Sequence, residues 1–396
     1  DLSRVWAGPL AGRILGDLGA DVIKIESPLV RALAAPNARH FGPDAGPQRP
    51  MLSQNKLARN KRSLCIDLRQ PEGVELVKRL AAKADVLVEN FSARVMPNFG
   101  LGYETLRVLN PGLIMLGMPG YGATGPYKNY LGYGPSSEAM TGMAALLGYP
   151  GEEPLNSAIA YPDAVAGLMG AAAVMTALVQ RARTGDGAFL DLSQLEPTTA
   201  MLGEYFLEYQ MTGQRPPRLG NRHPYWAPQG TYRCRGHDDW ISLCVRSDEE
   251  WQRFCAVTGI APRAEWATVA GRSAAMDEID AEIARWTGTR SKFEAMQALQ
   301  AAGIPAGAVL NAKELYEDPQ LAARGFFIAA RAPEGGNYPM PGTPITVDGE
   351  RREEWRAAPY PGEHNREVLA ELLGMADGAI AALEAQGVLV GPAPVA

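Results

Sequence analysis

Short apolar runs and helical stripes alternate along the first half of the chain. Leu10, Ile14 and Leu18 fall on one helical stripe that follows a tight turn. Apolar runs of strand length lie at 21–26, 64–68, 85–89, 113–117 and 188–192, and helices are predicted between them at 71–83, 103–109, 135–147 and 161–184. Strands that alternate with helices in this way predict an α/β fold with a parallel sheet.

The longest apolar stretch follows a single carboxylate. Asp163 precedes the uncharged residues 164–179, while Arg181 and Arg183 lie where the negative end of a helix dipole falls, and Gly185 predicts the stop. Two interpretations of Asp163 remain open at this point. It is either an N-cap, or an ionised carboxylate held at the positive end of a buried helix and aimed at a substrate.

Two patterns near the start of the chain resemble nucleotide sites. Gly8, Gly12 and Gly16 have the spacing GxxxGxxxG instead of GxGxxG, which disfavours a nicotinamide cofactor. A basic cluster is either a solvated face or a site for an anion such as phosphate, and it consists of Lys56, Arg59, Lys61 and Arg62. The glycine-rich segment 118–127 either admits an oxyanion to its backbone N–H groups or only turns the chain.

The amino-acid composition of the sequence changes near Gly213. Residues 213–236 mix Arg, Pro, Gly and aromatic residues, which predicts a linker with an active-site loop. A smaller α+β part and a tail follow. Their predicted strands are 240–245, 306–310, 326–331 and 343–347, and their predicted helices are 276–287, 291–302, 364–373 and 376–386.

Length, charge and cysteine content restrict the class of protein. A chain of 396 residues exceeds what one core usually supports, and a net charge of −6 argues against a nucleic-acid partner. Four cysteines without a CxxC pair predict buried thiols, no metal site and a cytoplasmic protein. The apolar run 164–179 is expected to fall short of a membrane span. Residues 1–5 look like the end of a strand, so the natural chain is expected to start earlier.

Taken together, the motifs resemble the family III CoA-transferases, which include formyl-CoA and carnitine CoA-transferases. The matching segments run nearly from end to end, and their order makes the resemblance specific. They are RVWAGPLAGRILGDLGADVIKIE (4–26), NKRSLCIDLRQPEG (60–73), ADVLVENF (84–91), GLGYE (100–104), GYGATGPY (120–127), YPDAVAG (161–167), TGDGAFLDLS (184–193), LGNRHPYWAPQGTY (219–232), residues 314–327 and GEHNREVLAELLG (362–374).

The resemblance implies an α/β fold with a Rossmann-like parallel-sheet large domain and a smaller α+β domain. The large CoA-binding domain would take residues 1–212 and the returning C-terminal segment 326–396, with the small domain at 213–325. It also implies a homodimer of interlocked rings. Asp163 falls on the catalytic aspartate of the family, which would form an anhydride and then an aspartyl-CoA thioester, with CoA and acyl-CoA as substrates and no tightly bound cofactor.

The resemblance further implies contacts to CoA and to the acid. The CoA positions are Trp6, Ala7, Arg69, Asn90, Phe91, Asn98 and Phe99, although core packing remains open for the two phenylalanines and a plain surface charge for Arg69. In the loop 213–236, the candidates for substrate contact are Arg222, His223, Tyr225 and Trp226.

Departures from the family pattern bear on the ligands. Ser27 stands where formyl-CoA transferase has an arginine, so the adenine would be held differently, with Arg31, Arg59 or Arg62 as substitutes. Trp6 stands where that enzyme has a glutamine that contacts substrate, which favours a bulkier or aromatic acid over small polar acids.

Two other functions remain in view. An α-methylacyl-CoA racemase needs a histidine as base, but the corresponding place holds Tyr133, and no histidine lies between residues 41 and 222. A non-catalytic CoA-binding paralogue is the second alternative, and the presence of Asp163 argues against it.

Overall fold

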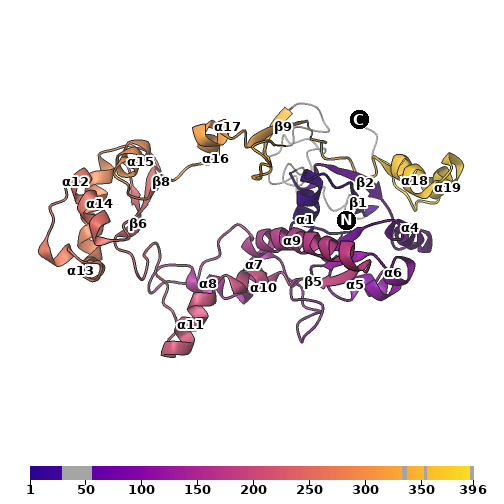
Figure 1. Ribbon diagram of the computed structural model, residues 1–396, viewed down its shortest axis with the longest axis horizontal. Helices are drawn as coiled ribbons and strands as arrows, with labels where there is room; N and C mark the ends of the chain where they lie inside the picture. Colours follow the sequence, from indigo (N-terminus) through magenta and orange to yellow (C-terminus); the bar gives the residue numbers. More distant parts are fainter. Residues whose placement is uncertain (29–55, 332–336, 352–354, 393–396) are drawn as a thin grey trace. The chain divides into compact units, whose positions relative to one another are not determined.

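The computed structural model describes residues 1–28, 56–331, 337–351 and 355–392. The chain divides into two compact units (Figure 1). Unit 1 comprises 1–143, 156–207 and 324–396, and unit 2 comprises 144–155 and 208–323. The expected boundaries at 213 and 326 lie close to two of these limits, and the short segment 144–155 also belongs to unit 2. The predicted adenine contact at Arg31 lies outside the described residues.

Unit 1 contains parallel strands, as the alternating pattern predicts. Strands β1 (Val22–Glu26) and β2 (Lys61–Cys65) pair in parallel, and so do β3 (Val86–Glu89), β4 (Ile114–Gly117) and β5 (Ala188–Asp191) in the order β3-β4-β5. This confirms an α/β fold with parallel sheets. It also places the carboxyl ends of β3, β4 and β5 along one edge.

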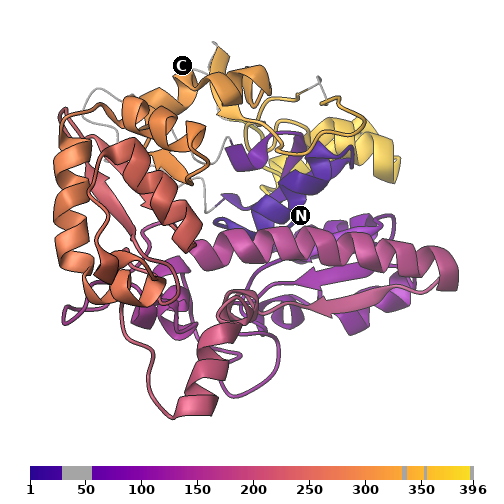
Figure 2. The ribbon, with the colours of Figure 1, turned by 60° about the vertical axis from the view of Figure 1, so that its left-hand side comes forward.

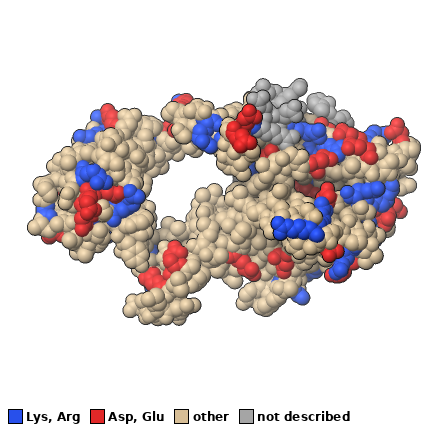
Figure 3. Space-filling view, in the orientation of Figure 1, with Lys and Arg blue, Asp and Glu red and all other residues tan. Residues whose placement is uncertain are grey.

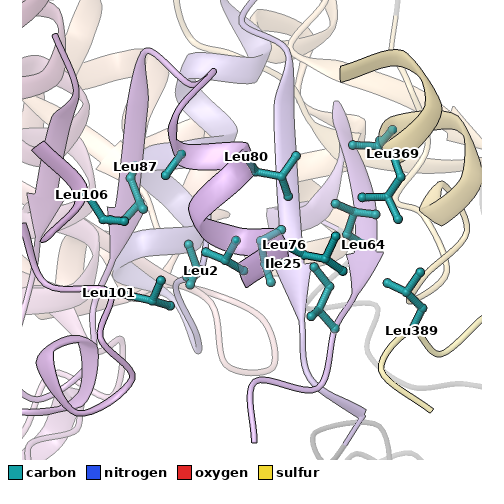
Figure 4. Packing of buried hydrophobic residues seen from close by; sticks show 14 of the residues in the cluster. Leu2, Ile25, Leu64, Leu76, Leu80, Leu87, Leu101, Leu106, Leu369 and Leu389 are labelled. Atoms are coloured by element: carbon teal, nitrogen blue, oxygen red, sulfur yellow. The ribbon is translucent and has the colours of Figure 1, made fainter. Parts of the chain in front are cut away.

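Residues 1 and 2 join the two parallel sheets. The carbonyl of Asp1 accepts the Ile25 N–H at 2.8 Å, and the Leu2 N–H donates to the carbonyl of Val88 at 2.8 Å. Leu2 is buried in the main hydrophobic cluster of unit 1 together with Ile25 and Leu87. Figure 4 shows these side chains with leucines of neighbouring helices and of the C-terminal segment, so the start and the end of the chain share one core.

Helices surround these strands. Those of unit 1 are α1 (Ala7–Asp17), α4 (Pro71–Ala81), α5 (Val95–Asn98), α6 (Tyr103–Leu109), α7 (Gly134–Met140), α9 (Tyr161–Thr184), α10 (Leu195–Ala200), α18 (Asn365–Leu373) and α19 (Asp377–Ala385). Strands β9 (Phe327–Arg331) and β10 (Asn337–Pro341) pair as an antiparallel hairpin. Strand β10 was not predicted, and the strand predicted at 343–347 does not form. Helices α8 (Met143–Leu146) and α11 (Gly203–Thr212) cross the limits between the units.

Helix α9 packs closely on α1 (Figure 2). A Cβ on Gly167 would lie 2.8 Å from Leu10 Cδ2 and 2.9 Å from the carbonyl oxygen of Ala7, so only glycine permits this approach. Among the described residues α9 is also the one helix long and apolar enough to cross a membrane. The uncharged run 164–179 covers sixteen of the 24 residues of this helix. Its packing on α1 and β4 is that of a core helix.

Three of the four residues of the basic cluster form neither a solvated face nor a free anion site. Arg59, Lys61 and Arg62 are buried, and each pairs with carboxylates of unit 1. Arg59 Nη2 lies 2.7 Å from Asp17, Lys61 Nζ lies 2.9 Å from Asp1, and Arg62 contacts Asp21, Glu367 and Glu371. These pairs allow β2 to begin at Lys61, three residues before the predicted start. They also leave Arg59 and Arg62 unsuited to hold an adenine.

Unit 2 is smaller and has an antiparallel sheet. Strands β6 (Gln229–Arg233), β7 (Trp240–Cys244) and β8 (Ala306–Ala308) pair in the order β6-β7-β8. Its other elements are α12 (Asp248–Thr258), the 3₁₀-helix Ala264–Trp266, α13 (Val269–Ala274), α14 (Met276–Gly288), α15 (Lys292–Ala301), α16 (Ala312–Glu317) and α17 (Pro319–Ala323). A separate core gathers Trp251, Phe254, Trp266 and Ile279.

Charged side chains of both signs are interspersed on the face shown in Figure 3, which has no continuous basic stripe. On this face the mixed distribution agrees with the small negative net charge of the sequence.

Candidate active site

Asp163 lies in the first turn of α9, where it does not cap the helix. The N-cap position is Ala160, which makes no side-chain capping bond, and Asp163 is the third helical residue. Asp163 is 7 % exposed, and the backbone N–H groups of Ala7, the first residue of α1, and of Asp163 itself act on its carboxylate and favour the ionised form. The N-cap interpretation is therefore wrong. The carboxylate instead occupies the place where the positive ends of α1 and α9 meet.

Burial governs the protonation of this carboxyl. Loss of solvent raises the pKa of Asp163 above its ordinary value, and the N–H groups of Ala7 and of Asp163 itself partly oppose that rise. The net direction is the reverse of what a helix N-terminus alone would give. Asp163 consequently takes up a proton more readily than an exposed aspartate.

The backbone around Asp163 is tightly packed and strained. A Cβ on Gly134, the first residue of α7, would lie 2.3 Å from the Cβ of Ala160 and 2.9 Å from Asp163 Oδ2. Ala158 and Ala160 have φ values of 64° and 40°, in the left-handed region that alanine rarely adopts. Each such residue costs about 1–3 kcal/mol and persists only where the surroundings enforce it.

Trp6 and Ala7 lie next to Asp163. Trp6 immediately precedes α1 and is half-buried, and Ala7 is fully buried with its N–H on the carboxylate. The ammonium of Lys56 lies 5.1 Å from the centre of the Trp6 ring, in a cation–π contact. The structure thus brings two predicted CoA positions together with the predicted catalytic residue and adds a cation beside them.

The other predicted CoA residues have different surroundings. The side-chain amide of Asn90 is engaged with Arg4, because its oxygen accepts the Arg4 N–H at 2.6 Å and its nitrogen donates to the Arg4 carbonyl at 2.8 Å. Phe91 and Phe99 both pack against the main core of unit 1. Asn90 therefore fixes the backbone that leads into Trp6, and the two phenylalanines have the packing role that the sequence left open.

Arg69 and Asn98 are accessible. The Arg69 side chain is 61 % exposed and pairs with Asp67 at 2.7 Å, which lowers the pKa of the Asp67 carboxyl to about 2. Asn98 ends α5 and is exposed. Both side chains can reach a ligand that lies outside the core.

A second carboxyl lies at the carboxyl edge of the β3-β4-β5 sheet and has no sequence signal beyond its place in the ENF motif. Glu89 ends β3, is buried, and accepts the Phe91 N–H at 2.8 Å. Burial, with Asp191 as a nearby like charge, raises the pKa of Glu89 to about 7. Asp191 in turn accepts the N–H of Ala123 from the glycine-rich segment. The glycine-rich segment is therefore bonded to this edge of the sheet at Ala123, which follows Gly122.

The predicted loop residues belong to unit 2. Arg222 Nη2 pairs with Asp277 at 2.5 Å and with Asp280 at 3.0 Å, so its guanidinium already has anionic partners. The ring of His223 stacks on Trp226 with centroids 4.1 Å apart, and its Nδ1 accepts the Tyr225 N–H. A cavity of about 550 Å³ adjoins Arg222, and its wall includes Asn221, Tyr232 and Trp240. Contact of these residues with a substrate stays a prediction.

Sequence reasoning missed two residues of α7 that support the segment leading into Asp163. Gly134 carries no signal in a chain with 43 glycines. Glu138, which is buried on α7, does carry a sequence signal. It is the single charged residue in the predicted helical segment 134–147. A lone buried charge in such a helix indicates a specific partner.

The described residues contain no group of three or more His, Cys, Asp or Glu side chains able to hold a metal ion. None of the four cysteines forms a disulfide; Cys65, Cys234 and Cys255 are buried, and Cys244 is partly exposed. The prediction of buried thiols is confirmed at three of the four positions and is wrong for Cys244.

Known proteins are similar to this chain over nearly its whole length. The sequence pattern of CoA-transferase family III matches residues 1–365. The succinate–glutarate CoA-transferase of Agrobacterium fabrum is 35 % identical over 94 % of this chain and 94 % of its own, and the succinyl-CoA–D-citramalate CoA-transferase of Chloroflexus aurantiacus is 35 % identical over 98 % and 96 %. A crystal structure of a CAIB/BAIF family protein from Brucella suis superposes with a TM-score of 0.82 at 34 % identity, covering 94 % of this chain and 97 % of that one.

Proposed function

The chain belongs to CoA-transferase family III and is an acyl-CoA:carboxylate CoA-transferase, and on this premise we propose that Asp163 carries the transfer as a covalent nucleophile. The observation that carries the proposal is the buried Asp163 carboxylate, which meets the N–H of Ala7 at the start of two helices. A carboxylate is a competent nucleophile towards acyl groups.

The transfer proceeds in two matched halves. An oxygen of Asp163 attacks the thioester carbonyl, the C–S bond breaks, and CoA leaves as its thiolate while a mixed anhydride forms. The thiolate then attacks the aspartyl carbonyl carbon, which releases the first acid as its carboxylate and leaves an aspartyl-CoA thioester. The acceptor carboxylate attacks the aspartyl carbonyl of this thioester, the C–S bond breaks, and a second mixed anhydride forms. The released thiolate then attacks the acceptor carbonyl of that anhydride, which gives the new acyl-CoA and returns Asp163 as a carboxylate. Each step exchanges one activated acyl group, a thioester or an anhydride, for another, so neither ATP nor a metal enters the scheme.

The surroundings of Asp163 suit these steps. The N–H of Ala7 and the positive ends of α1 and α9 stabilise the ionised form and the negative charge that develops at the attacked aspartyl carbonyl. Burial removes the water that would hydrolyse the anhydride. Because burial also raises the pKa of Asp163, the rate of acylation is expected to rise with pH until that carboxyl is ionised.

The CoA contacts follow from the same placement. Trp6 and Ala7 border the nucleophile and would receive the pantetheine arm, while the accessible Arg69 and Asn98 are the candidates for the nucleotide portion. Asn90 would support CoA binding indirectly, because its side chain holds the backbone of Arg4, two residues before Trp6.

The relatives point to a dicarboxylic acyl group. The two relatives named above act, by their names, on succinate, glutarate and citramalate as free acids or CoA esters. In this chain the cation of Lys56 on the Trp6 ring offers a partner for a second carboxylate. We therefore propose succinyl-CoA as the first donor to test. The bulkier acid favoured from Trp6 alone is the competing prediction, and one panel of acids measured by liquid chromatography decides between them.

A homodimer is proposed on separate grounds. Apolar residues of α9 lie exposed on unit 1, namely Leu168, Met169, Met175 and Val179, and α11 has no buried residue at all. Apolar faces of this extent on a folded unit usually bury against a second chain. Light scattering coupled to gel filtration is expected to give twice the chain mass of 42.5 kDa.

The nucleophile is tested by trapping. Wild-type protein incubated with succinyl-CoA and then hydroxylamine is expected to carry a hydroxamate on Asp163, found by peptide mass spectrometry. Asp163→Ala is expected to lose turnover while retaining CoA affinity and the melting temperature. Asp186→Ala, at an exposed position just after the same helix, is the matched control with wild-type activity. An active Asp163→Ala variant would refute the proposal.

A further inference from the structure

The segment before α9 determines where Asp163 points. Its residues Ala158 and Ala160 both have left-handed backbone conformations, and the carbonyl of Ala160 accepts the Asp163 N–H at 3.1 Å. Alanine leaves this region readily when nothing holds it. A side chain that anchors the segment therefore also orients the first turn of α9.

Glu138 is that anchor. Its side chain is buried, and both carboxylate oxygens accept hydrogen bonds from Ser157, one from the backbone N–H and one from the hydroxyl at 2.7 Å. The Ser157 hydroxyl oxygen also lies 3.5 Å from the N–H of Ile159, inside the same turn. A two-point bond to a single residue fixes both the position and the direction of the chain there.

Helix α7 holds the segment at both ends. Gly134 and Glu138 are four residues apart, so they lie on one face of the helix. Gly134 packs against Ala160 and Asp163 at one end of the segment, and Glu138 binds Ser157 at the other. The segment between them is short and strained. Its geometry therefore depends on α7 and not on α9 alone.

We propose that Glu138 is a positioning residue for the CoA-transfer reaction, which acts through Ser157 and the left-handed turn to aim the Asp163 carboxylate at the thioester. This inference rests on the proposed function of Asp163. It assigns no chemistry to Glu138, which donates no proton and touches no substrate.

The test compares three single variants and one double variant with a matched control. Glu138→Ala and Ser157→Ala remove the two sides of the contact, and Glu138→Gln keeps one acceptor oxygen. The control is Asn110→Ala, which removes three partly buried side-chain hydrogen bonds. Asn110 lies two residues before Gly112, whose carbonyl accepts Arg181 near the other end of α9, about 27 Å along the helix from Asp163 at 1.5 Å per residue. The measurements are kcat with succinyl-CoA, the affinity for CoA by calorimetry, the rate of hydroxylamine trapping at Asp163, and the melting temperature.

Glu138→Ala is expected to lower kcat and the trapping rate about 10²-fold, the usual cost of misplacing a reacting group by about 1 Å, with CoA affinity within twofold of wild type. Ser157→Ala, which keeps the backbone N–H, is expected to lose less, and Glu138→Gln to restore part of the rate. The double variant Glu138→Ala/Ser157→Ala is expected to match Glu138→Ala alone, because both changes break one contact. Asn110→Ala is expected to melt earlier and to keep the wild-type kcat.

The outcomes separate the two proposals. Wild-type protein that forms no adduct on Asp163 would refute the nucleophile and this inference with it. A wild-type adduct together with a wild-type trapping rate in Glu138→Ala would refute the inference alone. If Glu138→Ala does not fold, Ser157→Ala decides by the same measurement: an unchanged trapping rate refutes the inference, and a reduced rate with unchanged CoA affinity supports it.

Discussion

Glu89 provides a pH-dependent term in the stability of unit 1. Its carboxyl lies at the end of β3, 6 % exposed, and Gly117 approaches so closely that a Cβ there would be 2.9 Å from Glu89 Oε1. Burial is the main reason that the pKa of Glu89 rises from 4.5 to about 7, and Asp191 adds to the rise. We predict that Glu89→Gln, which keeps the size and the acceptor for the Phe91 N–H, removes this term.

The sign and size of the effect follow from proton linkage. The folded protein holds the proton more tightly than the unfolded chain, so stability is fully present below pH 4.5 and is lost as the pH rises to about 7. The interval of about 2.5 pH units, at about 1.36 kcal/mol each, gives about 3 kcal/mol in all. Between pH 5 and pH 8 the unfolding free energy of the wild type should therefore fall by about 2.5 kcal/mol relative to Glu89→Gln.

The assay is urea unfolding at pH 5 and pH 8 for both proteins, with the difference between them taken at each pH so that other titrating groups cancel. In melting temperature the change corresponds to about 5–10 °C. Glu104→Gln, whose side chain is 82 % exposed, is the control and should show no such change. A Glu89→Gln advantage that is equal at both pH values would refute the reasoning.

Three further substitutions test the packing and the hydrogen bonds that support the site. Gly167→Ala places a methyl group against the carbonyl of Ala7 and should lower kcat at least tenfold and stability by about 1–3 kcal/mol, as measured by kinetics and urea unfolding. Asn90→Ala removes both bonds to Arg4 and should cost about 2 kcal/mol of stability as well as activity; loss of CoA affinity without loss of stability would contradict its structural role. Arg272→Ala, fully buried in unit 2 and bonded to three carbonyls, should cost about 3–5 kcal/mol, seen as early melting of that unit by calorimetry.

The hydrophobic periodicity of the sequence predicted most of the parallel strands of unit 1 and the helices between them. The helix 103–109 and both ends of 161–184 coincide with α6 and α9, because Pro111 follows the first helix closely and Pro162 and Gly185 mark the two ends of the second. The start of β2 at Lys61 could not be predicted. Its basic residues are buried only because carboxylates distant in sequence pair with them. The helix expected over 135–147 is divided at Gly142, whose φ is 90°.

The site was predictable in part. The position of Asp163 before a long apolar helix identified it as a candidate, and the structure adds the Ala7 N–H that its role requires. The sequence could not show that Ala160, and not Asp163, precedes the helix, since alanine gives no signal of a left-handed backbone. It also could not pair Glu138 with Ser157, because a hydrogen bond across nineteen residues leaves no periodic trace.

The way unit 1 closes has a consequence for how the chain is made. Residues near the C-terminus complete the edge of β2, where the Asp67 N–H donates to Val388 and the Val390 N–H donates to Cys65. The Gln70 side chain and Gly387, which also touch, are separated by 317 residues. At a synthesis rate of about 5–20 residues per second, β2 leaves the ribosome roughly 16–63 s before the segment that covers it. During that interval the edge of β2 lacks the backbone partners that the later segment supplies, and a chaperone is the natural protection for it.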